Sequence, residues 1–171
     1  MANVSGTVTS ALSLIEPGTP QLATGQNLQN NINKTLSVAF TNGTAASQID
    51  TIYALSGNFT ASTAKVIHLG NGSVSDAYSN PVSMVHLTTL YFANLATTDT
   101  SANQVTVGTA SNGITTLFPS TSTVIIPAGG SILINAGLTG YLVTSGTADA
   151  ITFTPSTGTP AFELIALGRS A

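Results

Sequence analysis

The 171-residue chain contains no cysteine and no tryptophan, and only 5% of its residues are charged. Without cysteine, a disulfide framework, a thiol nucleophile and a thiolate metal site are all excluded. The three cations, Lys34, Lys65 and Arg169, are too few to neutralise a row of phosphates, so we expect no nucleic-acid partner. A basic membrane-surface helix is excluded on the same ground, and we expect no membrane partner.

Long apolar runs are also absent. No stretch approaches the length of a membrane span, and the first residues, Met-Ala-Asn-Val-Ser, are not a basic and then apolar leader. We therefore expect neither a signal peptide nor a transmembrane helix. Because about a quarter of the residues in a soluble domain are usually charged, this surface must be hydrated by Ser, Thr and Asn instead.

The pattern that is present has a period of two, which is typical of β-strands. Strand segments recur about every ten residues between Gly, Pro or Asn, as in an all-β sandwich or barrel. Asn42 and Gly43 predict a hairpin turn, and a break is expected near Thr88 and Thr89. We predict an all-β chain that forms one β-sandwich or jelly-roll-like domain. The expected strands are 4–14, 35–40, 49–55, 66–69, 82–95, 105–107, 123–126, 131–135, 141–144, 151–154 and 162–167.

One segment departs from this pattern. Residues 17–33 are polar and rich in Gln and Asn, with Leu22, Leu28 and Ile32 as the larger apolar residues. A connection of this length usually has a task such as binding a neighbour, so we predict these three side chains as partner-binding anchors. A loop lying across one sheet is the alternative. The predicted organisation is an N-terminal strand plus polar arm over 1–33 and a sandwich body over 34–171.

The ionisable residues are scattered. His68 and His86 are each flanked by strand-type residues, and they could meet across neighbouring strands to form a metal site with Asp50 or Asp76. Histidines that pack on half-buried strands are the favoured interpretation. The chain has no Gly-x-Ser-x-Gly elbow, phosphate loop or calcium loop. We therefore expect no enzyme activity, no cofactor and no bound metal.

The near-absence of charge affects assembly. Charged edge residues normally block strand-to-strand association, and this sheet protein has few of them. Obligate interfaces resemble protein cores and avoid charge. The composition therefore favours a permanent subunit of a larger object, with other copies of the chain as one partner.

The order of strands and turns in the second half of the chain can be compared with that of known protein families. A strand over 89–95 ends in Asn-Leu, 104–108 forms another strand, and 124–134 combines a Pro-Gly corner with an apolar strand; 148–153 and 162–168 complete the set. Over about residues 80–171 this order resembles a module of tailed-bacteriophage structural proteins. By size and composition, the chain is similar to capsid decoration, or cement, proteins.

The resemblance implies a structural role without a cofactor. Decoration proteins of this type are β-sandwiches or jelly rolls that sit on the outer capsid surface, usually as oligomers, and clamp neighbouring major capsid subunits. It implies the major capsid protein and one or two further copies of the chain, as a dimer or trimer, as partners. It also implies a place on the virion after synthesis in the host cytoplasm. The resemblance transfers no site residue to this chain.

Two other classes remain open. A head-fibre or tail module that binds a receptor or carbohydrate would use aromatic platforms, for which Tyr53, Tyr78, Tyr91 and Tyr141 are available without any Trp. A shell protein of a small single-jelly-roll virus would need a basic arm for the genome, whereas the N-terminal segment through Lys34 contains one lysine and no arginine.

Overall fold

A computed structural model describes residues 4–17, 29–108, 111–119 and 121–171. These residues separate into two compact units. The hairpin unit comprises the described residues of Gly6–Ala39, and the sandwich unit comprises the described residues of Phe40–Ala171 together with the two that precede Gly6. Within the described ranges, no helix is long and apolar enough to cross a membrane.

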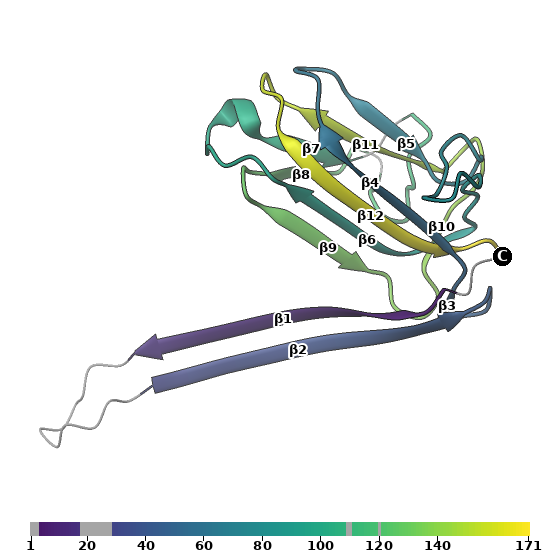
Figure 1. Ribbon diagram of the computed structural model, residues 1–171, viewed down its shortest axis with the longest axis horizontal. Coiled ribbons are helices and arrows are strands. Elements are labelled where there is room, and N and C mark those ends of the chain that lie inside the picture. The colour runs from purple at the N-terminus through teal and green to yellow at the C-terminus, as the bar shows by residue number, and fades with distance from the viewer. Residues whose placement is uncertain (1–3, 18–28, 109–110, 120) are drawn as a thin grey trace, which may run out of the picture. The chain divides into compact units, whose positions relative to one another are not determined.

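The hairpin unit consists of β1 (Gly6–Pro17) and of β2 (Gln29–Asn42) as far as Ala39, and the two strands are neighbours in one sheet (Figure 1). Thr9 Oγ1 lies 2.9 Å from Ser37 Oγ, and Ser13 Oγ donates to Asn33 Oδ1 at 2.8 Å. A step of four residues forward on β1 matches four residues back on β2, so the pairing is antiparallel. Because β2 begins at Gln29, the end of the segment expected to be a polar loop is strand.

The turn predicted at Asn42 and Gly43 does not close a hairpin. β2 pairs in parallel with β3 (Gln48–Ile49), and a tight two-residue turn cannot join parallel strands. The chain instead makes a short loop in which the Gln48 side chain accepts a hydrogen bond from the Ala45 N–H at 2.9 Å. After this loop the chain runs beside the end of β2 in the same direction as β2.

The sandwich unit is built from two antiparallel sheets (Figure 1). In the β6 sheet, β12 lies between β4 and β6, and the other side of β6 pairs with both β9 and β10. The β11 sheet has the order β5, β11, β7, β8, and a short 3-10 helix, η1 (Ser101–Asn103), precedes β7. The strands of the first sheet are β4 (Thr51–Asn58), β6 (His86–Asn94), β9 (Ser131–Asn135), β10 (Tyr141–Leu142) and β12 (Ala161–Arg169). Those of the second are β5 (Lys65–His68), β7 (Val105–Gly108), β8 (Thr123–Ile126) and β11 (Ala150–Pro155).

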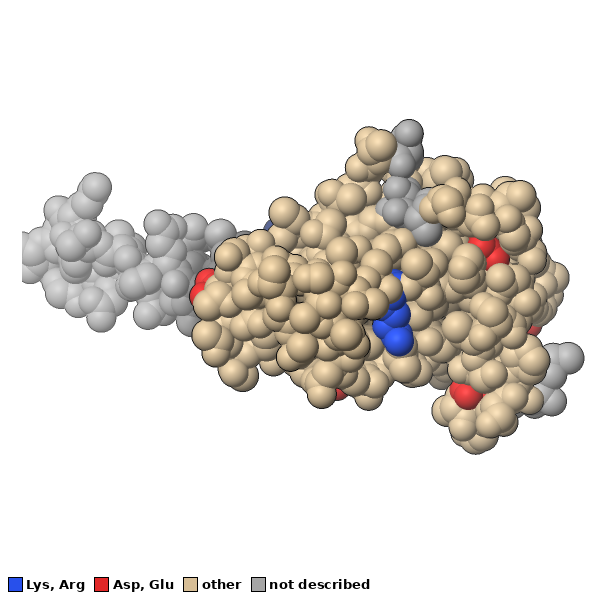
Figure 2. All heavy atoms as spheres, turned by 90° about the horizontal axis from the view of Figure 1, so that it is seen from above, with Lys and Arg blue, Asp and Glu red and all other residues tan. Residues whose placement is uncertain are grey.

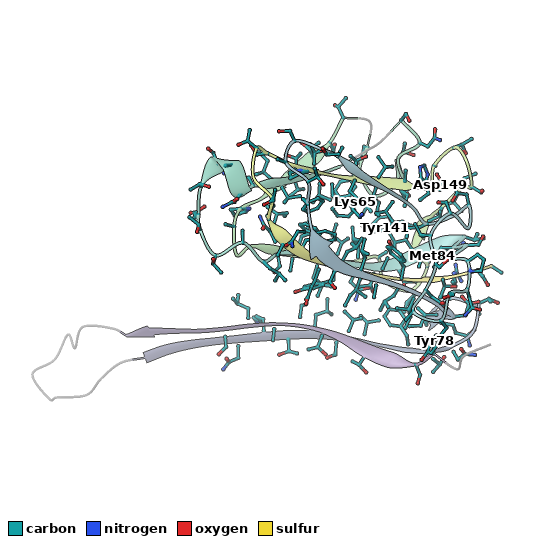
Figure 3. All side chains as sticks on the ribbon, turned by 45° about the horizontal axis from the view of Figure 1, so that its top comes forward. Lys65, Tyr78, Met84, Tyr141 and Asp149 are labelled. Carbon is teal, nitrogen blue, oxygen red and sulfur yellow. The ribbon has the colours of Figure 1, made fainter. Side chains whose placement is uncertain are left out.

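Aromatic rings from both sheets meet in the core. The ring centroids of Phe92 on β6 and Phe153 on β11 are 4.9 Å apart, and Phe59 lies 4.3 Å from Phe162 on β12. Figure 3 shows the side chains that fill the space between the sheets, including the buried Met84. Burying each large apolar side chain contributes about 1.5–3 kcal/mol, so this shared core holds the two sheets together.

The predicted fold class is confirmed: the described chain is an all-β, sandwich-like protein. The expected break near Thr88 and Thr89 is instead a shift of register inside the continuous strand β6. Leu167 on β12 pairs with Thr89, whereas Gly168 pairs with Leu87, so Thr88 is the extra residue. A bulge of this kind interrupts the alternation of side chains without ending the strand.

Candidate functional site

The predicted anchors fall largely outside the part of the chain that the structure describes. Leu22 and Leu28 lie outside the described residues, and Ile32 lies within β2. Their role in partner binding therefore stays a prediction. The described part of the same hairpin nevertheless has two chemically different faces.

The register of the hairpin sorts its side chains by parity. Because Thr9 faces Ser37 and Ser13 faces Asn33, odd-numbered residues of both strands share one face and even-numbered residues share the other. The odd face contains small and polar residues: Thr7, Thr9, Ala11, Ser13, Asn33, Thr35, Ser37 and Ala39. The even face, which we call the hairpin apolar face, contains Val8, Ser10, Leu12, Lys34, Leu36 and Val38.

The hairpin apolar face is exposed. Leu12 is 50% exposed and Leu36 is 60% exposed. A two-stranded ribbon is marginally stable in water unless a further strand or layer covers one of its faces. This face therefore has the composition of a binding surface. Its side chains form two rows, one on β1 and one on β2.

The side of the β6 sheet that faces away from the core is also apolar. Ile52, Leu133 and Ile165 alternate with core residues on β4, β9 and β12, so they lie on this outer face, and each is 37–38% exposed. The strand registers arrange the face in three cross-strand rows. These rows are Ala54, Ile165, Tyr91, Leu133; Ile52, Leu167, Thr89, Asn135; and Ser56, Glu163, Ala93, Ser131.

The outer face of the β11 sheet is different. Thr106, Thr152 and Thr154 alternate with the core residues of β7 and β11. The exposed apolar residues of this face lie on its edge strands: Val66 on β5 is 43% exposed, and Ile125 on β8 is 59% exposed. The surface view in Figure 2 shows how few charged residues the molecule presents from that side. This threonine-rich face can hydrogen-bond to water, so it does not need a partner to be hydrated.

The two histidines are not brought together. His68 belongs to β5 and His86 to β6, which lie in different sheets. Among the described residues, no three His, Cys, Asp or Glu side chains form a group that could hold a metal ion. Asp50 and Asp76 therefore do not join the histidines in the metal site that the sequence left open.

Each histidine has a neighbour in its own part of the sandwich: His68 lies beside Asp149, and His86 lies beside Arg169. His68 Nδ1 lies 3.0 Å from Oδ1 of Asp149, whose side chain is fully buried and also accepts the Gly146 N–H. This pair ties β5 to the chain that enters β11. His86 pairs with Arg169 across β6 and β12, and its pKa is lowered, first by burial and then by the Arg169 charge.

The carboxylates of Asp76 and Asp50 accept hydrogen bonds from neighbouring residues. Asp76 accepts the side-chain and backbone N–H groups of Asn80 and the backbone N–H of Tyr78, and the Asn80 side-chain bond is the main reason why the Asp76 pKa is lowered. Asp50 accepts hydrogen bonds from Thr51 and from the backbone and side chain of Ser170. These carboxylates hold loops in place.

A cleft of about 520 Å³ lies beside these loops. Asp50, Ile52, Asp76, Tyr78 and Asn80 are among the residues that line it. The Tyr78 side chain is 77% exposed, and it is the most exposed large aromatic ring among the described residues. A cleft with one open ring and several hydroxyl and amide groups can hold a small polar molecule.

Sequence reasoning missed the residues that make the two apolar faces. The presence of Leu36 and Val38 at alternate positions is visible in the sequence, but the register that puts Leu12 opposite Lys34 and Val8 opposite Val38 on the same face is not. The outer residues of the β6 sheet, such as Ile165, look like core residues until the order of the strands is known. No protein-family model, curated protein or solved structure matches this chain.

Proposed function

We propose that this protein is a structural component of a virus particle, which decorates a tailed-phage capsid and stabilises it by binding across major capsid subunits. The observation that carries the proposal is the hairpin, whose apolar face exposes Leu12 on β1 and Leu36 on β2. Such an element is suited to reach a neighbouring subunit and to bury its face there. The resemblance of residues 80–171 to phage structural proteins supports the same function.

The edges of the sandwich support an assembled state. Two strands at the ends of the sheets, β4 and β8, contain no charged residue. Uncharged edges are a hazard for a free monomer, because they offer unpaired N–H and C=O groups to other strands. They are tolerated in a protein whose place in an assembly keeps such edges apart or covered.

Stabilisation by decoration requires only differential binding. A protein that binds the assembled shell and not its free subunits shifts the equilibrium toward the shell. Many identical weak contacts on one lattice then add up through avidity. Since the contact surface has few charges, its affinity should depend little on salt.

The test is co-sedimentation of the full chain with empty mature capsids of its source phage. We expect a fixed ratio of protein to shell that persists at about 1 M NaCl, where the Debye length is only about 3 Å. The substitution L36S should lower the bound fraction about tenfold, because it removes an exposed apolar contact. The matched control S37A, on the opposite face of β2, should bind normally. Protein that stays in the supernatant, or that is released at moderate salt, would show the proposal to be wrong.

A carbohydrate-binding module is the second candidate, and the exposed Tyr78 beside its cleft favours it. An open tyrosine ring can stack on the apolar face of a sugar, with the nearby amide and hydroxyl groups donating hydrogen bonds. The test is retention on a glycan array, compared between the native chain and Y78A. Retention that Y78A abolishes supports this second function, and equal signals from both proteins rule out this cleft.

A further inference from the structure

We propose that two copies of this chain exchange hairpins, so that the hairpin apolar face of each copy packs on the outer face of the other copy's β6 sheet. The inference concerns the same hairpin face as the proposed function: it names a second copy of the chain as the neighbouring subunit that the hairpin reaches, and it does not require a capsid. It rests on a match between two surfaces in pattern, charge and size. Each surface belongs to one unit of the chain and was described above for that unit alone.

The two surfaces carry the same pattern of residues. Along β2 the apolar face presents Lys34, Leu36 and Val38, and along β12 the outer face presents Glu163, Ile165 and Leu167. Each series is one charged residue followed by two apolar residues at alternate positions, with a spacing of about 7 Å along the strand. With Lys34 placed on Glu163, Leu36 lies over Ile165 and Val38 over Leu167.

The charges are complementary. Lys34 is the one charged residue among the hairpin side chains that the structure describes. Glu163 is the one charged residue in the three rows of the β6 sheet, and it is exposed. Opposite single charges in apolar surroundings fix the register of an interface, because a shifted arrangement would leave each of them against apolar side chains.

The area argues for a reciprocal exchange between copies. The described part of the apolar face is a strip about 10 Å wide and about 26 Å long, or about 260 Å². One hairpin on one sheet therefore buries about 500 Å² in total, less than the roughly 1,000 Å² that a specific interface needs. Two reciprocal contacts reach that value, and a second copy is the partner that supplies both the hairpin and the sheet.

Cross-linking between differently labelled copies tests the contact. The chain has no cysteine, so L36C and I165C each introduce a single thiol at an exposed position. We expect a short bismaleimide to link an equimolar mixture of the two full-length variants into a covalent dimer. The control mixture replaces I165C by I125C, on the other sheet, and should stay monomeric on a denaturing gel. No dimer in the first mixture, or equal dimer in both, would overturn the proposal.

Charge reversal tests the register. K34E and E163K should each raise the dissociation constant of the dimer about tenfold by placing like charges together, as measured by light scattering against concentration. The combined variant K34E/E163K should restore most of the affinity, which no merely structural role of either residue would do. Unchanged affinity in the single variants, or no rescue in the double variant, would contradict the contact.

Capsid binding separates this inference from the proposed function. A chain that is monomeric at every concentration and still pellets with capsids refutes the hairpin exchange and leaves the decoration role. A cross-linked, charge-dependent dimer that ignores capsids supports the exchange and refutes the decoration role.

Discussion

The outer faces of the two sheets of the sandwich differ, although both sheets contribute to the same core. The outer face of the β6 sheet presents Ile52, Leu133 and Ile165, with Ile165 on a central strand. On the β11 sheet threonines cover the two central strands, and the exposed apolar residues Val66 and Ile125 lie on the edge strands. Folding constrains the inward residues of both sheets equally, because they must fill one core. The outward residues are free to vary, so their difference reports on what each face contacts. The continuous apolar rows of the β6 sheet agree with its proposed use as the contact surface.

The largest expected effect comes from removing the core that both faces share. F92A deletes a fully buried ring that lies between Phe59, Phe153 and Phe162. We expect a loss of about 4 kcal/mol in the free energy of unfolding, from lost burial and the remaining cavity. Urea denaturation followed by circular dichroism measures it. Two separate transitions in the native protein would show that the sheets do not fold as one unit.

The second largest effect should come from the buried carboxylate next to the β11 sheet. D149A removes a fully buried carboxylate and leaves His68 and the Gly146 N–H without their partner. We expect a loss of about 3 kcal/mol, measured in the same denaturation experiment. An exposed carboxylate outside both sheets provides the control, and D99N should unfold within about 0.5 kcal/mol of the native protein. Equal losses in both variants would contradict the structural role of the buried pair.

The comparison of the two faces is sharpened by one matched pair of variants. I165T and I125T replace an exposed isoleucine on the β6 sheet and on the β11 sheet, respectively. We expect I165T to weaken self-association about tenfold and I125T to leave it unchanged, because only the first residue lies in the apolar rows. Sedimentation velocity over a range of concentrations gives both constants. Equal weakening by the two substitutions would assign no special role to the β6 sheet.

The smallest effect is a pH dependence that originates on the β6 sheet. Burial, with the Arg169 charge as a second cause, lowers the pKa of His86 in the folded protein. As the pH falls below about 6.5, the usual histidine pKa, His86 of the unfolded chain binds a proton. His86 of the folded chain stays neutral until the pH is lower, so the unfolded state is favoured. Stability should therefore be complete above that pH and should decrease as the pH falls toward the folded pKa. The variant H86Q should flatten this part of the plot of unfolding free energy against pH. An unchanged slope would show that another titrating group causes the pH dependence.

The sequence predicted most of the sandwich, because its strands are short and separated by turn residues. The strands expected at 123–126 and 131–135 match β8 and β9, and that expected at 162–167 lies within β12. The parallel pairing of β2 and β3 was missed because Asn42 and Gly43 suit a tight turn, while the loop depends on the Gln48 side chain. Local sequence carries the strand positions but not the choice of partner.

The candidate site was harder to predict for the same reason. Leu36 and Glu163 are ordinary strand residues in the sequence, and they become parts of a surface only through pairing with distant strands. The polar composition of residues 17–33 drew the prediction toward Leu22, Leu28 and Ile32, of which only Ile32 belongs to a described strand. Leu12, Lys34 and Leu36, which the prediction did not name, lie in the regular part of the strands.

The register between β4 and β12 has a mechanical consequence. Thr51 at the start of β4 pairs with Gly168 near the end of β12, so the chain enters one strand and leaves the other at the same end of the pair. A pull applied between residue 51 and the C-terminus would load the hydrogen bonds of this pair one after another, as in a zipper. A pull between residue 51 and the start of β12, at Ala161, would load them together in shear. A force on the C-terminus that is resisted at residue 51 would therefore separate β4 from β12 more easily than the same force in the shear geometry.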